Sequence, residues 1–132
     1  MIEYFNLFGA RTVTLPSPMP APAITELGVG YSRRRVVVTL PADLPGSVTY
    51  LYAQNGSQKS ATLTATQAYL AGLAVDLVLG DFAGLAGWDP SAAPSVGSPA
   101  DYSVTATSSN ATGSLCTGTG VRVLTSSFSG SN

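Results

Sequence analysis

The sequence contains no histidine and only one cysteine, Cys116. Without histidine, the chain lacks the usual general base, the commonest metal ligand and the side chain that titrates near neutral pH. A hydrolytic triad is therefore excluded, and a lone cysteine allows neither an internal disulfide nor a metal-binding cluster. These absences predict a protein that is not an enzyme and has no cofactor or metal. For Cys116 itself, a small buried apolar side chain is favoured over a reactive thiol.

Charged residues are also scarce, at 10% of 132 residues, whereas ordinary soluble domains have about a quarter. The formal net charge of -1 provides no long-range field to attract nucleic acid or an anionic membrane. Serine, threonine, alanine, glycine and valine make up most of the chain. Solubility must therefore come from hydroxyls and backbone groups, or much of the surface is covered by neighbouring molecules.

The N-terminal residues have neither the basic region nor the uninterrupted apolar run of a secretory signal peptide. This predicts synthesis and assembly in a cytoplasm, although the Ser/Thr-rich composition is typical of exterior proteins. The length predicts a single domain, residues 1–132, that is large enough to bury a core of its own.

β-Branched residues mark the strongest strand signals in the chain. Residues 33–40 are rich in valine and stop at Pro41, and residues 47–53 form a second such run. The dipeptide Asn55-Gly56 follows, which tolerates the positive φ angles of a tight hairpin turn. Further short strands are predicted at residues 11–15, 57–64, 102–107, 113–117 and 121–125.

One helix is predicted at about residues 65–80. Thr64 and Gln67 have the spacing of a capping box, and apolar side chains recur at helical spacing at Leu70, Leu73, Leu77 and Val78. The apolar stretch from residue 66 to 88 raises the question of a membrane span. Asp76 near its centre would cost about 3 kcal/mol there, so no membrane partner is predicted.

Seven or eight short strands with one helix predict a mainly β fold, an antiparallel β-sandwich or barrel with the helix packed at its side. An α+β fold is the alternative. Prolines at every second position from 16 to 22 favour an extended N-terminal arm, residues 1–22. The Ser-rich C-terminal tail, residues 125–132, has one large apolar side chain, Phe128, so its order is expected to depend on partner subunits.

The candidate binding residues are aromatic or basic. The only basic cluster, residues 33–35, would place Arg33 and Arg35 on one face of a strand and Arg34 on the other. Trp88, beside Asp89-Pro90, is favoured as a plug over the core edge, with a sugar platform as the alternative. The sequence thus predicts no catalytic, cofactor or metal residues and a candidate assembly interface at Tyr4, Phe5, Phe8, Arg33, Arg35, Trp88 and Phe128.

A low lysine content, abundant small and hydroxyl residues, a proline-rich arm and the missing signal peptide together resemble the small structural proteins of bacteriophage virions, of the capsid decoration, cement or coat type. The resemblance rests on composition, so no site residues are carried over from it. It implies a non-enzymatic subunit of a viral particle, made in the host cytoplasm, that contacts copies of itself or other capsid proteins.

Two other functions are kept as alternatives. One is a carbohydrate- or receptor-binding module that uses Trp88 and the nearby loops. The other is an RNA-packaging coat in which Arg33 and Arg35 face the genome, although the near-neutral net charge counts against a nucleic-acid partner.

Overall fold

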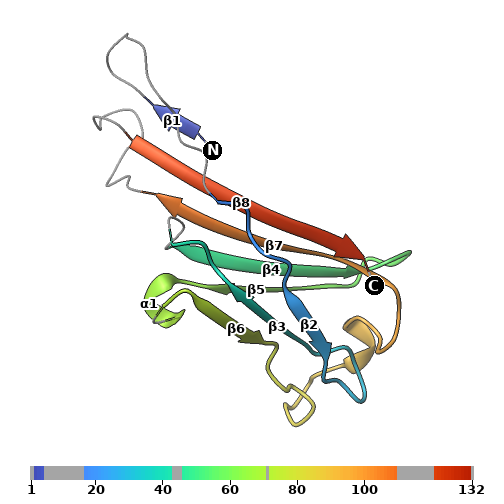
Figure 1. Ribbon diagram of the computed structural model, residues 1–132. Coiled ribbons are helices and arrows are strands. Elements are labelled where there is room, and N and C mark those ends of the chain that lie inside the picture. The colour runs from blue at the N-terminus through green and yellow to red at the C-terminus, as the bar shows by residue number, and fades with distance from the viewer. Residues whose placement is uncertain (1, 5–16, 43–45, 71, 110–120, 132) are drawn as a thin grey trace.

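The computed structural model describes residues 2–4, 17–42, 46–70, 72–109 and 121–131. Its strands are β1 Ile2–Tyr4, β2 Ala23–Glu26, β3 Arg34–Thr39, β4 Ser47–Gln54, β5 Ser60–Ala65, β6 Ala74–Val78, β7 Ala100–Ser109 and β8 Val121–Ser131. They form a five-stranded sheet in the order β1-β8-β7-β4-β5 and a three-stranded sheet in the order β2-β3-β6 (Figure 1). All neighbouring strands are antiparallel.

The chain passes between the two sheets after β1, β3, β5 and β6, and makes hairpins within them at β2–β3, β4–β5 and β7–β8. A sheet of five strands and a sheet of three strands, both antiparallel, together form a β-sandwich. The two sheets stay separate rather than closing into a barrel. The predicted mainly β, antiparallel sandwich is therefore confirmed, and it carries no function by itself.

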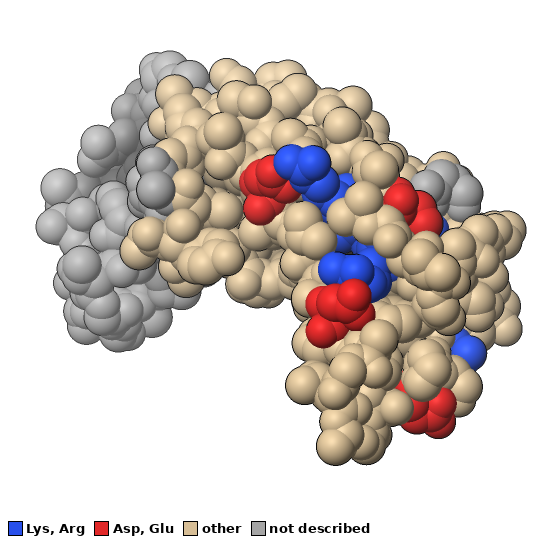
Figure 2. All heavy atoms as spheres, turned by 90° about the horizontal axis from the view of Figure 1, so that it is seen from below, with Lys and Arg blue, Asp and Glu red and all other residues tan. Residues whose placement is uncertain are grey.

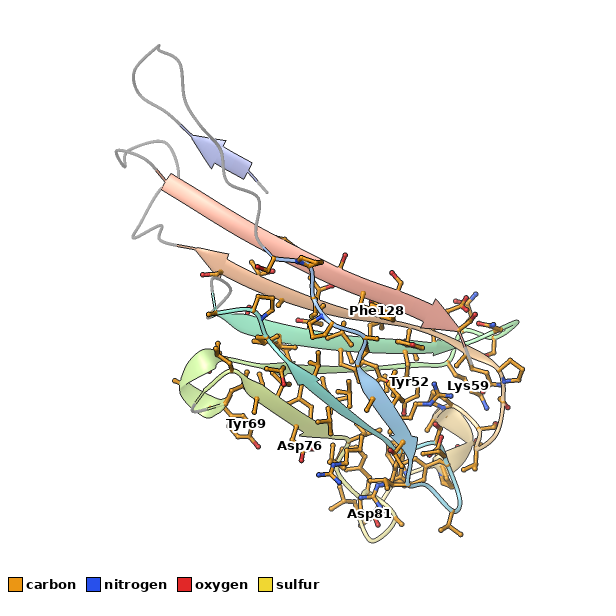
Figure 3. All side chains as sticks on the ribbon, in the orientation of Figure 1. Tyr52, Lys59, Tyr69, Asp76, Asp81 and Phe128 are labelled. Atoms are coloured by element: carbon orange, nitrogen blue, oxygen red, sulfur yellow. The ribbon has the colours of Figure 1, made fainter. Side chains whose placement is uncertain are left out.

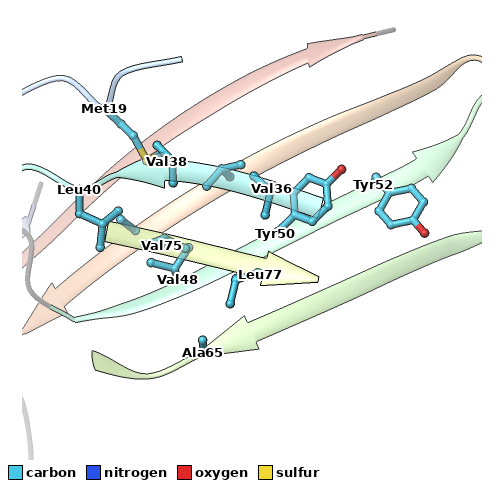
Figure 4. Close-up of a cluster of buried hydrophobic side chains, with 12 residues drawn as sticks. Met19, Val36, Val38, Leu40, Val48, Tyr50, Tyr52, Ala65, Val75 and Leu77 are labelled. Carbon is cyan, nitrogen blue, oxygen red and sulfur yellow. The ribbon is translucent and has the colours of Figure 1, made fainter. Parts of the chain in front are cut away.

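The core lies between the sheets and follows the two-residue period of the strands. In β3, buried and exposed positions alternate without exception, with Val36 and Val38 inward. In β4 the inward residues are Val48, Tyr50 and Tyr52. The cluster also contains Met19, Leu40, Ala65, Val75, Leu77, Val104 and Ala106 (Figure 4). Each large side chain buried here contributes about 1.5 to 3 kcal/mol.

The predicted helix is present but much shorter than expected. The helix α1 spans only Gln67–Leu70, and the chain then forms β6 where helix was predicted. In β6, which pairs with β3, Val75 and Leu77 point into the core between the two sheets and are buried there. The segment fits both a helical and an alternating pattern, and pairing with β3 favours the strand because it buries these side chains and satisfies the backbone together.

The predicted capping box does not form either. Thr64 lies in β5, where its hydroxyl is 3.2 Å from that of Thr49 on β4. The short helix is instead closed by the Thr66 carbonyl, which accepts hydrogen bonds from the N–H groups of Tyr69 and Leu70, both at 3.0 Å. The helix therefore starts at Gln67, three residues beyond the predicted cap at Thr64.

The expectation that the Ser-rich tail needs partner subunits to become ordered is wrong. The tail is the second half of β8, which pairs with β7 of the same chain from Ser109↔Val123 to Asp101↔Ser131. Cross-strand hydrogen bonds use the backbone, so a strand forms here without large side chains. Phe128 also packs against the core and stacks on Tyr102, with ring centroids 6.4 Å apart.

Part of the N-terminal arm belongs to the sandwich. β1 pairs with the start of β8, from Ile2↔Val123 to Tyr4↔Val121. Residues 17–22 form neither helix nor strand, as the prolines predict, and Met19 is buried in the core. The strands predicted at residues 11–15 and 113–117, together with Cys116, lie outside the described residues.

The β4–β5 hairpin confirms the predicted Asn55-Gly56 turn. Gly56 has a φ of 72° and open space where a Cβ would lie, so only the backbone angle demands glycine. We expect Gly56→Val to lower the free energy of unfolding by about 1 to 2 kcal/mol, measured by urea denaturation. Gly30 also has open space but no left-handed φ, so Gly30→Val should change stability by less than about 0.5 kcal/mol. Equal effects would contradict this account of the turn.

Candidate assembly interface

The basic cluster lies at the start of β3 and is divided by the strand period. Arg34 is 4% exposed and points into the sandwich, whereas the side chain of Arg35 is 47% exposed on the outer face of the small sheet. Arg33 precedes the strand and is partly buried. The predicted separation of Arg34 from Arg35 is therefore confirmed.

Each arginine of the cluster is paired with a carboxylate. Arg33 Nη1 lies 3.0 Å from Asp81 Oδ2, and Arg35 Nη2 lies 2.5 Å from Asp76 Oδ2. Arg34 Nε lies 3.6 Å from Glu26 Oε2. Figure 2 shows the basic and acidic side chains adjacent to one another on this side of the molecule, and Figure 3 shows Asp76 and Asp81 on the side of the small sheet away from the large one. The cluster is thus neutralised by its own chain.

The two exposed acids of these pairs are held ionised. The hydrogen bond from the Arg35 guanidinium lowers the pKa of Asp76. The pKa of Asp81 is lowered mainly by the backbone N–H of Ala83, which donates to Oδ1 at 3.1 Å, and further by the charge of Arg33. Neither carboxylate can therefore act as a proton donor near neutral pH.

Arg34 belongs to a buried polar network that sequence reasoning did not identify. The hydroxyl of Ser32 donates to Glu26 at 2.5 Å, and the hydroxyl of Tyr52 donates to the Ser32 carbonyl at 2.7 Å. The guanidinium of Arg34 lies 5.0 Å from the centre of the Tyr52 ring, close enough for a cation–π contact. The alternation of buried and exposed positions in β3 is the sequence signal for this network. It places Arg34 on the core face, and a buried arginine requires an acid beside it.

Trp88 lies in an aromatic cluster in the segment between β6 and β7. Its ring centroid is 5.3 Å from that of Tyr31 and 5.2 Å from that of Phe82, at tilted angles. The Phe82 N–H donates to the Tyr31 hydroxyl at 2.6 Å, which fixes the cluster. Trp88 is partly buried beside Tyr31, which is 3% exposed, but it does not belong to the buried core cluster, so its interpretation as a plug over the core edge stays a prediction. A sugar platform would need a free ring face, and two rings already pack against this indole.

A small pocket lies beside this cluster. Its volume is about 230 Å³, and its lining is Leu27, Val29, Gly30, Tyr31, Arg33, Asp81, Ala83, Trp88 and Pro90. Pockets for drug-sized molecules are typically about 300 to 1,000 Å³. This one is smaller, and its lining is mostly apolar apart from Arg33 and Asp81, which pair with each other. Its size suits one apolar side chain of a partner.

The outer face of the large sheet carries almost no charge. We call it the hydroxyl face and define it as Ser47, Thr49, Leu51 and Ala53 of β4, Ser60, Thr62 and Thr64 of β5, Asp101, Ser103, Thr105 and Thr107 of β7, and Thr125, Ser127, Ser129 and Ser131 of β8. The register aligns Thr64, Thr49, Thr105 and Ser127 in one row across the four strands. Asp101 is its single charged member.

The outer face of the small sheet is similarly poor in charge. On β3 and β6 its exposed members include Val37 and Val78, at 41% and 42% exposure. Its charged residues there are Arg35 and Asp76, which neutralise each other. At the described strand positions named above, both outer faces of the sandwich thus lack the scattered lysine and glutamate side chains of an ordinary soluble surface.

The predicted interface residues do not gather on one surface. Arg33 and Trp88 line the same pocket, and Arg35 lies on the small sheet. Tyr4 pairs with β8 in the large sheet, and Phe128 lies in β8. Phe5 and Phe8 are outside the described residues.

Within the described part of the chain, no three acidic, cysteine or histidine side chains come together as metal ligands would. A search of the same residues for a helix that is long and apolar enough to cross a membrane also finds none. Comparisons with protein-family models, curated proteins and solved structures found no match to this chain. Function is therefore inferred from the geometry of the surfaces.

Proposed function

We propose that this protein is a non-enzymatic structural subunit of a bacteriophage particle, such as a capsid decoration, cement or coat protein, which assembles through contacts between subunits. The observation that carries the proposal is the low charge of both outer sheet faces. At the strand positions described above, the hydroxyl face has one charged residue, Asp101, and the small sheet has one self-neutralised pair, Arg35 and Asp76.

A surface of this kind is suited to repeated contact with other protein surfaces. Depletion of charge is the main compositional mark of the buried centre of an interface, because an unpaired charge is costly to desolvate. Exposed Val37 and Val78 on the small sheet add apolar area that a neighbour would cover. The hydroxyl face adds polar groups that need no counter-charge when they are buried.

Two observations favour this proposal over the alternatives. An RNA-packaging coat would present unneutralised cations to phosphates, whereas Arg33 and Arg35 each have a carboxylate partner at 3.0 Å or less. A carbohydrate-binding module would present an open aromatic face, whereas Trp88 is packed by Tyr31 and Phe82.

Mass in solution tests the proposal. Sedimentation velocity of the full chain over a wide range of protein concentrations should show the mass rising above that of one chain, 13.4 kDa. Binding of RNA should be absent at physiological salt, and a glycan array should give no signal. A monomer at every concentration, together with tight salt-sensitive RNA binding or a specific glycan signal, would replace this function by one of the alternatives.

A further inference from the structure

The free edges of the two sheets differ in how well they are protected. A strand edge presents unpaired N–H and C=O groups, and proteins usually block it with charge, proline or a very short strand. β2 follows Pro20 and Pro22 and ends at Glu26, and β6 contains Asp76. β5 contains neither charge nor proline, but it is shorter than the free part of β8, at six residues, and Lys59 lies directly before it.

The remaining edge, on the β1 and β8 side of the large sheet, has no such protection. β1 covers only Val121–Val123 of β8, so the outer edge of β8 from Leu124 to Ser131 has no partner strand among the described residues. These eight residues contain no charge and no proline. In an antiparallel strand every second residue presents both backbone groups to the same side. The result is a long uncharged template for another strand.

We propose that this edge pairs with the same edge of a second copy of the chain, as antiparallel strands about a two-fold axis at Phe128. The inference rests on the proposed function and specifies its subunit contact. The pairing joins two large sheets into one continuous sheet through β-augmentation. It is an isologous contact, in which the same surface serves both subunits.

The faces of the β8 side chains and the position of β1 together select this register. Residues directly opposite in an antiparallel pair share a face, so inward Phe128 must oppose an inward residue and the exposed serines must oppose exposed ones. A two-fold axis at Ser127 would bring the second copy's Ser131 to Val123, which already pairs with Ile2. An axis at Phe128 leaves residues 125–131 paired and β1 undisturbed, and is the longest register that does so.

The resulting contacts suit both faces. Phe128 would lie opposite Phe128 of the second copy, next to the stack that it already forms with Tyr102, and aromatic cross-strand pairs stabilise antiparallel sheets. On the other side Ser127 would oppose Ser129, so the rows of the hydroxyl face would continue across the axis. No charged side chain is buried by the pairing.

Charge placed on the edge tests this contact. The double variant Ser127→Lys/Ser129→Lys puts lysine opposite lysine twice across the axis, and we expect sedimentation to show loss of the dimer at concentrations where the wild type associates. The variant Ser127→Glu/Ser129→Glu should lose the dimer equally, because glutamate then faces glutamate. An equimolar mixture of the two variants should restore the dimer, because each lysine then faces a glutamate.

The matched control is Ser91→Lys/Ser95→Lys. Both residues are exposed in the segment between β6 and β7, outside the hydroxyl face and away from β8, so the added charge is equal and association should be retained. Circular dichroism should show the native fold in all variants, because every substituted side chain is exposed. Edge variants that associate like the wild type, or a mixture that stays dissociated, would overturn the pairing.

A cross-link checks the register without adding charge. In a Cys116→Ser background, mixing Ser127→Cys with Ser129→Cys should give an oxidised dimer of the two variants, and Ser127→Cys alone should not. A cross-link in Ser127→Cys alone would overturn the axis at Phe128. A wild type that never associates would instead refute the proposed function itself, whereas association that is indifferent to all edge variants would refute only this contact.

Discussion

A chain that lacks residues 126–132 is expected to lose its cooperative unfolding transition. The deletion removes six cross-strand pairs between β8 and β7, from Ala106↔Ser126 to Asp101↔Ser131. It also removes Phe128, which packs on Tyr102 at the border of the core. Val104 and Ala106, which are fully buried, would then lie in a new edge strand.

The magnitudes support a loss of the fold rather than a mild weakening. Backbone hydrogen bonds contribute about 1 kcal/mol each, and burial of a phenylalanine adds about 1.5 to 3 kcal/mol. Together these terms approach the total stability of a small domain, about 5 to 15 kcal/mol. Thermal unfolding followed by circular dichroism should therefore show no transition, or one at a much lower temperature.

Removal of residues 1–4 provides the control at the other terminus. β1 contributes only three cross-strand pairs, all at one end of β8, and β8 would keep its full pairing with β7. This variant should retain the native spectrum and a cooperative transition. If the two truncations behaved alike, the tail would not be the structural strand that β8 is taken to be.

Arg34→Ala is expected to lower the free energy of unfolding by about 2 to 4 kcal/mol, since breaking a buried ion pair costs about 3 to 5 kcal/mol and Glu26 keeps some access to water. The change removes the ion pair with Glu26 and the contact with the Tyr52 ring. It also leaves a void beneath β3, because the Arg34 side chain is 5% exposed.

Arg35→Ala is the matched control, one residue away on the opposite face. Arg35 makes the closer contact, 2.5 Å to Asp76 against 3.6 Å from Arg34 to Glu26. Both partners are about half exposed, however, and water and salt screen such a pair, so its loss should lower stability far less than Arg34→Ala does. Urea denaturation of both variants compares the two effects. A larger loss for Arg35→Ala would mean that contact distance outweighs burial here.

The central strands could be predicted because local signals and tertiary packing agree there. Residues 36–39 are β-branched, and residues 34–39 alternate in the structure between core and surface. Gly56 occupies the left-handed turn that its sequence position predicts. The alternation also placed Arg34 and Arg35 on opposite faces. Signals of this kind depend only on neighbours along the chain.

The misplaced elements depend on partners distant in sequence. Leu73, Leu77 and Val78 have helical spacing, but β3 offers Val36 opposite Leu77 and so stabilises a strand. The side chains of the serine-rich tail give no signal of order, whereas its order comes from hydrogen bonding to the backbone of β7. Neither pairing is visible in a window of ten or fifteen residues.

The candidate interface was predictable only in part. The aromatic and basic residues singled out in the sequence are real features, but their partners are not local. Asp76 and Asp81, which neutralise Arg35 and Arg33, lay in the segment assigned to the helix and its end. The hydroxyl face was likewise hidden, because its rows are made by the register of four strands rather than by any one segment.

The pairing of the first strand with the last also sets the order of events in folding. Residues 2–4 cannot pair with residues 121–123 until residue 123 has left the ribosome. Contacts between distant segments make β-sandwiches slow to fold, in milliseconds to seconds. During that interval one edge of β7 has no partner strand, because β8 has not yet paired with it. The newly made chain is then most exposed to pairing with the wrong neighbour, so dilution or a chaperone should raise the yield of native protein more than slower heating or cooling would.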